Sequence, residues 1–235
     1  MKPNLTLWLS AAVLGLSVAC VSAAEKPNAA GTWQWSFTGR DGQTRETTLK
    51  LKQDGQKLTG VVIGRSGNET AIADGKIMDD QVSFTVSRER NGQQSTMKYQ
   101  GKLKGDTIKG TTEFERDGET RSREWEAKRS VAGTWKWTFT PPGGQSFDVT
   151  LKLKQDGDKL TGTLIRGERE SPVQEGKFKD GEVSFQVTRE REGQTITTKY
   201  QGKLSADTIK GKITSNFGGE ERTFDWEAKR DKEAK

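Results

Sequence analysis

Apolar and polar residues alternate along short segments from about residue 30 to the end of the chain. Trp33, Trp35 and Phe37 are each separated by one polar residue, and Leu49 and Leu51 follow the same pattern. A period of two residues predicts β-strands that have one apolar face. Turn dipeptides such as 54–55, an Asp-Gly pair, lie between these segments and favour tight hairpins. Seven such breaks in residues 30–129 predict eight strands.

The alternating pattern occurs twice. The segment GTWQWSF at 31–37 returns as GTWKWTF at 133–139, and WEAKR at 125–129 returns at 226–230. A repeat of this length indicates a duplicated structural unit. We therefore predict repeat 1 at residues 30–129, repeat 2 at 131–230 and a charged tail at 231–235. The second copy is one residue shorter between its third and fourth strands, where a loop tolerates the change.

The unpaired edges of the predicted strands indicate that each repeat closes into a barrel. Eight short antiparallel strands expose unpaired edges unless the sheet closes on itself. The register that contains Val82, Phe84 and Val86 is apolar, whereas the register of Lys98 and Lys102 is polar. A membrane barrel has the opposite arrangement, with its apolar residues outside. The predicted fold class is all-β: two tandem eight-stranded antiparallel up-and-down β-barrels, which follow a signal peptide.

Residues 1–24 have the features of a secretory signal. Lys2 is followed by an uncharged apolar stretch at 5–18 and by small residues suited to cleavage after Ala23 or Ala24. We expect a secreted or periplasmic protein without a membrane span in the mature chain. Cys20 is the only cysteine, and its surroundings distantly resemble a lipoprotein box. A membrane-anchored lipoprotein attached through Cys20 is the alternative.

The amino-acid composition limits the kinds of partner and reaction that we expect for this protein. The 39 basic and 33 acidic residues are interspersed, which is typical of a solvated surface and predicts no nucleic-acid partner. The chain has no histidine, so it lacks the commonest general base and metal ligand. Its carboxylates fall mostly in the polar register. We expect no enzyme activity, no metal and no cofactor.

The ends of each repeat carry a family resemblance. A Gly-x-Trp at the start of the first strand and an Arg at the end of the last resemble the calycin group, which contains lipocalins, fatty-acid-binding proteins and avidins. The resemblance implies that the Trp closes one end of each barrel and that the Arg lies against it. It covers topology only, so biotin or retinoid binding is not implied. The residues expected to close the barrels are Gly31, Trp33, Trp125 and Arg129, and then Gly133, Trp135, Trp226 and Arg230.

The opposite end of each barrel is the candidate binding site. Four arginines of the first repeat fall in the inward register there, and guanidinium groups bind carboxylate, sulfate or phosphate through paired hydrogen bonds. An alternative is a rim from which the arginines extend into water. Two tyrosines are candidate stacking walls, with core packing as their alternative role. The predicted residues are Arg45, Arg88, Arg121, Arg123 and Tyr99 in repeat 1, and Phe147, Arg189, Arg222, Phe224 and Tyr200 in repeat 2.

The function expected from this pattern is binding of a small amphiphilic or anionic ligand at the barrel mouths. One alternative is a structural or interaction module of the cell envelope that binds a protein or polysaccharide, and another is a hydrolase of unknown class. A cavity of some hundreds of Å³ would favour ligand binding. A packed interior beside an exposed apolar patch would favour the interaction module.

Overall fold

The computed structural model describes residues 27–39, 42–64, 66–90, 92–116, 118–191, 193–217 and 220–231. The predicted signal peptide, Cys20 and all but the first residue of the predicted tail lie outside these ranges. Every element in the described part is a β-strand. A search of the same residues found no helix with the length and apolar character needed to span a membrane.

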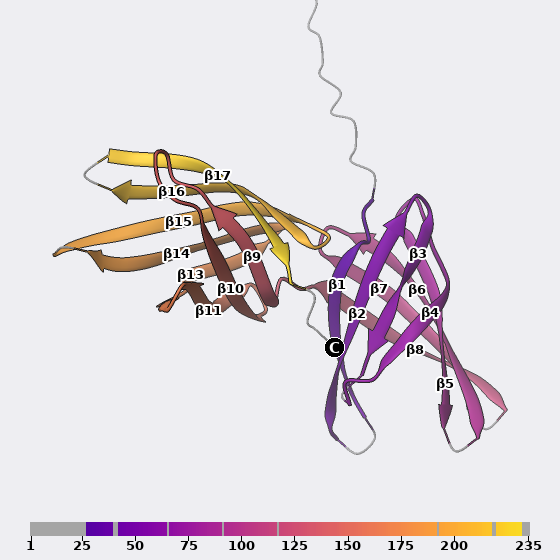
Figure 1. Ribbon diagram of the computed structural model, residues 1–235. Coiled ribbons are helices and arrows are strands. Elements are labelled where there is room, and N and C mark those ends of the chain that lie inside the picture. Colours follow the sequence, from indigo (N-terminus) through magenta and orange to yellow (C-terminus); the bar gives the residue numbers. More distant parts are fainter. Residues whose placement is uncertain are drawn as a thin grey trace, which may run out of the picture.

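The first repeat forms a closed barrel in which each strand pairs with the next in antiparallel fashion (Figure 1). The last strand pairs with the first through Trp33 opposite Arg129 and Gln34 opposite Lys128. This pairing closes the sheet and leaves no edge strand. The strands are β1 (Gly31–Thr38), β2 (Thr44–Asp54), β3 (Lys57–Ile63), β4 (Glu69–Met78), β5 (Gln81–Arg90), β6 (Gln93–Lys104), β7 (Thr107–Arg116) and β8 (Glu119–Arg129).

The second repeat closes in the same way, through Arg230 opposite Trp135. The prediction of two closed eight-stranded antiparallel barrels is therefore confirmed. Its strands are β9 (Gly133–Phe139), β10 (Phe147–Asp156), β11 (Lys159–Arg166), β12 (Arg169–Pro172), β13 (Gln174–Lys179), β14 (Glu182–Arg191), β15 (Gln194–Ser205), β16 (Thr208–Phe217) and β17 (Glu220–Arg230).

One detail differs from the turn count: the fourth strand of the second barrel is split into β12 and β13. Both segments pair with β11, and the break falls at Val173, whose N–H donates to the Gly162 carbonyl at 2.9 Å. The first barrel has a register shift at the matching place in β4, between Ala73 and Lys76. The residues at these irregularities, Asp74 and Glu175, have φ angles of 53° and 52°. A bulge thus bends the fourth strand in both copies, and in the second it interrupts the ladder.

An aromatic stack runs through each barrel interior. Phe84 lies parallel to Tyr99 with ring centroids 4.7 Å apart, and Trp125 contacts Tyr99 edge-on at 5.3 Å. The second barrel repeats this with Phe185 and Tyr200 at 4.5 Å. These rings are all buried, so they supply much of the apolar area removed from water on folding.

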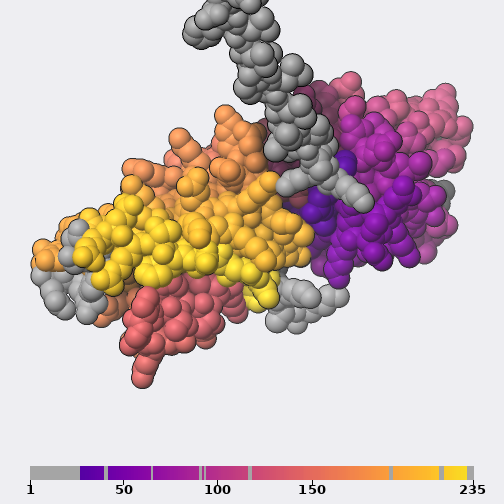
Figure 2. Space-filling view, turned by 90° about the horizontal axis from the view of Figure 1, so that it is seen from above, coloured from indigo at the N-terminus to yellow at the C-terminus, as the bar shows by residue number. Residues whose placement is uncertain are grey.

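The two barrels are joined through their closed ends. Only residues 130–132 separate β8 from β9. A Cβ atom on Gly31 would lie 3.5 Å from the Ala206 carbonyl oxygen, so a turn of the second barrel packs against the first strand of the first. The space-filling view shows the lobes in contact, and the ribbon shows the opposite ends pointing apart (Figures 1 and 2). The two ends that lie away from the linker are therefore separate from each other.

Candidate functional site

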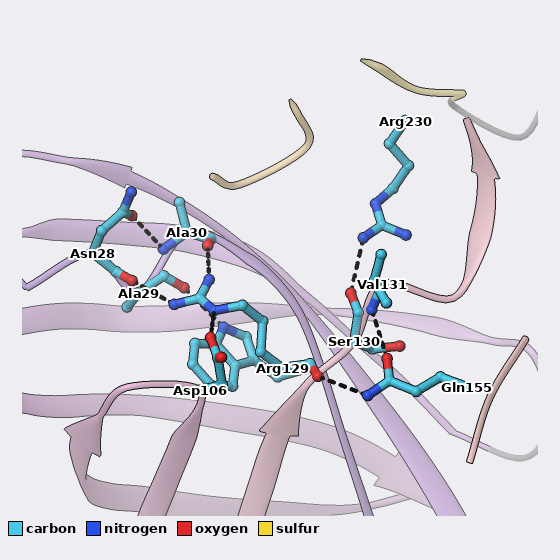
Figure 3. Close-up of polar contacts among 10 residues, drawn as sticks. Asn28, Ala29, Ala30, Asp106, Arg129, Ser130, Val131, Gln155 and Arg230 are labelled. Atoms are coloured by element: carbon cyan, nitrogen blue, oxygen red, sulfur yellow. Dashed lines mark hydrogen bonds and ion pairs between the residues drawn. The ribbon is translucent and has the colours of Figure 1, made fainter. Parts of the chain in front are cut away.

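The closed end of the first barrel is held by Arg129 (Figure 3). Its guanidinium lies 4.3 Å from the ring centroid of Trp33 and pairs with Asp106 at 2.9 Å. It also donates to the carbonyls of Ala30 at 2.6 Å and Asn28 at 2.8 Å. Burial lowers the pKa of Arg129, and the Asp106 carboxylate opposes that shift. All three guanidinium nitrogens of this buried cation donate to atoms of the same barrel end, which indicates a structural role.

The chain before the first strand plugs this end. Ala29 is fully buried, accepts a hydrogen bond from the Trp33 indole at 2.8 Å and donates its N–H to Gln53 at 2.7 Å. Gly31 has a φ of 128°, and a Cβ atom there would lie 3.0 Å from the Arg129 guanidinium. Glycine is therefore required both by backbone conformation and by the approach of Arg129.

The second barrel repeats the arrangement with the linker as its plug. Arg230 lies 4.3 Å from the Trp135 ring centroid, pairs with Asp207 at 3.1 Å, and donates to the carbonyls of Ala132 and Ser130. Val131 takes the position of Ala29 and is fully buried. The Gly, Trp and Arg residues that the sequence assigned to closure thus meet at one end of each barrel. Trp125 and Trp226 lie elsewhere, in the aromatic stacks of the interior.

The other end of the second barrel opens into a cavity of about 820 Å³. Its walls are aromatic and aliphatic, and its rim is charged. Four arginines and two glutamates line it, so the charge of the lining is positive. The predicted residues Phe147, Arg189, Tyr200, Arg222 and Phe224 all contribute to this lining.

Three phenylalanines form one side of the mouth. Phe139 lies 5.5 Å from Phe147 and 5.4 Å from Phe224, measured between ring centroids. The Arg166 guanidinium stacks 3.3 Å from the centroid of Phe147. Arg166 is not among the residues predicted from the sequence, and its equivalent in the first repeat is Gly64. Its spacing of two residues from the buried Leu164 was the available signal.

Two arginines of the cavity lining influence the ionisation of Tyr200. Burial raises the pKa of Tyr200 to about 12, and the positive charges of Arg189 and Arg166 oppose that rise. Arg222 lies farther out, is exposed and pairs with Glu220 at 3.2 Å. Among the arginines that line the cavity, Arg166 and Arg189 are therefore half-buried, whereas Arg222 is exposed.

The mouth of the first barrel is built differently. The Arg123 guanidinium lies 4.5 Å from the ring centroid of Phe37, and that of Arg45 lies 6.0 Å from the same ring. Arg121 is directed to Glu119 at 3.2 Å. Burial raises the pKa of Tyr99, and the charges of Arg88 and Arg123 oppose the rise. The mouth thus gathers Arg45, Arg88 and Arg123, although Arg123 is exposed rather than inside.

Among the residues that the structure describes, no group of three or more His, Cys, Asp or Glu side chains is placed to hold a metal ion. Comparisons with protein-family models, with curated proteins and with solved structures found no match for this chain. Its class is therefore defined by fold and site: a tandem pair of closed eight-stranded antiparallel barrels in which the second barrel opens into a cationic, aromatic-lined cavity.

Proposed function

We propose that the protein is an exported, non-catalytic binding protein of the calycin type whose second barrel holds a small anionic amphiphile. The observation that carries this proposal is the cavity of about 820 Å³ at the mouth of that barrel. This volume lies in the range of small-molecule sites. Export rests on the leader predicted at residues 1–24, with lipid attachment at Cys20 as the alternative.

The lining favours an anion with an apolar body. Aromatic and aliphatic walls such as Phe139 and Leu164 gain free energy when they cover apolar ligand surface. Arg166, Arg189 and Tyr200 line the same cavity, where a carboxylate or sulfonate would receive charge-assisted hydrogen bonds from the two guanidinium groups. A cationic mouth also raises the local concentration of anions and speeds their association.

Isothermal titration with dodecanoate tests the proposal. We expect one site per chain, and at least about tenfold weaker binding in the double variant Arg166→Ala, Arg189→Ala, because hydrogen bonds to charged groups contribute about 1.5–3 kcal/mol. The matched control is Arg45→Ala with Arg88→Ala in the first barrel, which should leave this site unchanged. Absence of binding of both dodecanoate and planar aromatic sulfonates to the unaltered protein would refute ligand binding and favour the envelope interaction module.

A further inference from the structure

Several facing pairs of residues near the mouth differ between the two barrels, and one of them carries this inference. Thr198 of β15 lies opposite Ser215 of β16. In the first barrel the corresponding strands, β6 and β7, place Met97 opposite Phe114. Met97 and Thr198 each lie two residues before the tyrosine of the aromatic stack. This tyrosine is Tyr99 in the first barrel and Tyr200 in the second. The duplication therefore offers an internal comparison of this pair.

In the first barrel the larger pair occupies the interior. Met97 is partly buried against the core, and its Sδ accepts a hydrogen bond from the Tyr99 hydroxyl at 3.8 Å. The ring of Phe114 is half-buried, with its centroid 6.0 Å from the Arg123 guanidinium. A thioether and a phenyl ring thus take up space that the second barrel leaves open.

In the second barrel the corresponding pair is small and polar. The hydroxyl groups of Thr198 and Ser215 lie 3.1 Å apart, and both residues line the cavity. Thr198 is only 6% exposed. Two short side chains in place of Met and Phe leave room for a ligand and present hydroxyl groups to it.

Trp137, which contacts Tyr200 and Trp226 in the aromatic stack, adds an unpartnered donor to the cavity lining. The residue lines the cavity and is 8% exposed. Its indole Nε1 is buried and has no hydrogen-bond partner among the described residues. A buried donor without an acceptor is destabilising, so such groups are rare unless something else supplies the acceptor. An acceptor oxygen on a bound molecule would satisfy it.

We infer that the ligand carries a hydrogen-bond-accepting oxygen on its buried apolar body, in addition to its anionic group. The class is an aromatic or alicyclic acid that bears a carbonyl or similar oxygen, rather than an acid with a plain hydrocarbon tail. Trp137, Thr198 and Ser215 are the residues that select it. This inference rests on the proposed function, because it assumes that the second cavity binds an anion.

Two planar sulfonates of similar shape test the inference by isothermal titration with the full chain. Anthraquinone-2-sulfonate carries two central carbonyl oxygens, and anthracene-2-sulfonate has none. We expect the quinone to bind about three- to tenfold more tightly, the ratio that one or two net hydrogen bonds give. Trp137→Phe keeps an aromatic ring but removes the N–H, and should remove this preference while changing the anthracene affinity by less than about twofold.

Two further variants complete the experiment. Trp35→Phe, the equivalent change in the first barrel, should leave both affinities unchanged. Thr198→Met with Ser215→Phe installs the pair found in the first barrel, and should weaken both sulfonates by at least about tenfold because the cavity is filled. Thermal unfolding of this variant confirms that it is folded.

The outcomes separate the two proposals. Equal affinity for both sulfonates, or an equal loss of both in Trp137→Phe, would overturn the inference and leave the proposed function in place. Full binding by the folded Thr198→Met, Ser215→Phe variant would also overturn it, since the ligand would then lie elsewhere. Failure of both sulfonates and of dodecanoate to bind would overturn the proposed function as well.

Discussion

The closed end of each barrel depends on a single guanidinium. Arg129 uses its Nε, Nη1 and Nη2 atoms on Asp106, Ala30 and Asn28 while its plane covers Trp33. A cation over an indole contributes about 0.5–2 kcal/mol in addition to the hydrogen bonds. In the second barrel Asp207 has an exposed side-chain fraction of 57%, against 21% for Asp106. Solvent therefore screens the second ion pair more, and the first should be the stronger of the two.

Truncation of the closing Trp tests this seam. Trp33→Ala should lower the free energy of unfolding by about 3–5 kcal/mol, as for other buried aromatics, because it also removes the hydrogen bond to Ala29. Urea unfolding followed by circular dichroism measures the change. Met78→Ala, at a side chain that is 59% exposed, is the control and should stay within about 0.5 kcal/mol. A loss below about 1 kcal/mol for Trp33→Ala would contradict the seam.

Tyr200 makes the stability of the second barrel depend on pH. Its pKa is raised to about 12, so the folded state keeps a proton that the unfolded state loses near pH 10. The stabilisation is complete below pH 10 and decreases as pH rises from about 10 to 12, by roughly 1–3 kcal/mol. Urea unfolding at pH 9 and pH 11.5 measures it. Tyr200→Phe should remove most of the difference, and an identical decrease in that variant would contradict this origin.

At the scale of the strand, backbone contact between neighbours decides where glycine is needed. Gly211 of β16 lies opposite Gly202 of β15. On its other side, Gly211 lies opposite Trp226 of β17. A Cβ atom on Gly211 would lie 1.9 Å from the Gln201 carbonyl oxygen. The glycine pair therefore lets the strands approach closely beneath the aromatic stack.

Two glycine substitutions distinguish the effect of close strand approach at Gly211 from the effect of a positive φ angle in a turn. Gly211→Ala should lower the free energy of unfolding by at least about 2 kcal/mol, because the backbone must move to accept the methyl group. Gly193 lies in a hairpin turn with a φ of 75° and has open space around it. Gly193→Asn should cost less than about 1 kcal/mol, since Asn tolerates that conformation. Equal losses in urea unfolding would contradict the close approach.

At the scale of the whole molecule, the linker belongs to both barrels. Residues 130–132 continue the strand that ends at Arg129, and the Ser130 N–H donates to the Thr32 carbonyl at 2.7 Å. The same segment plugs the second barrel, where Arg230 and the Trp135 indole donate to its carbonyls. The barrels are thus linked by a structural element of the second one.

Two fragments of the second barrel measure the contribution of this plug. The fragment 130–231 retains it, and the fragment 133–231 lacks it together with the buried Val131. We expect the shorter fragment to melt at least about 10 °C lower, because a loss of 2 kcal/mol lowers the Tm of a domain of this size by about that amount. Equal melting temperatures by circular dichroism would show that the linker does not stabilise the barrel.

The closing residues were easier to predict than the mouth. Gly31 and Trp33 are two residues apart in an alternating strand, so their register is a local property, and the closing Arg occupies the same place in both repeats. The mouth depends on the ends of strands, where Arg123 turns out to be exposed and Arg166 was missed. Strand ends twist, and long cationic side chains can extend either inward or into solvent, so the register alone does not place them.

The sequence by itself determined the duplication, the all-β class and the closure of each repeat, because alternation, turn residues and repeat length are read along the chain. Only the tertiary structure decided how full each interior is. That property depends on pairs such as Met97 with Phe114 and Thr198 with Ser215, which come together only when neighbouring strands take their register. The physical reason is that side-chain period assigns a face, whereas the space left on that face depends on the combined volumes of side chains from several strands.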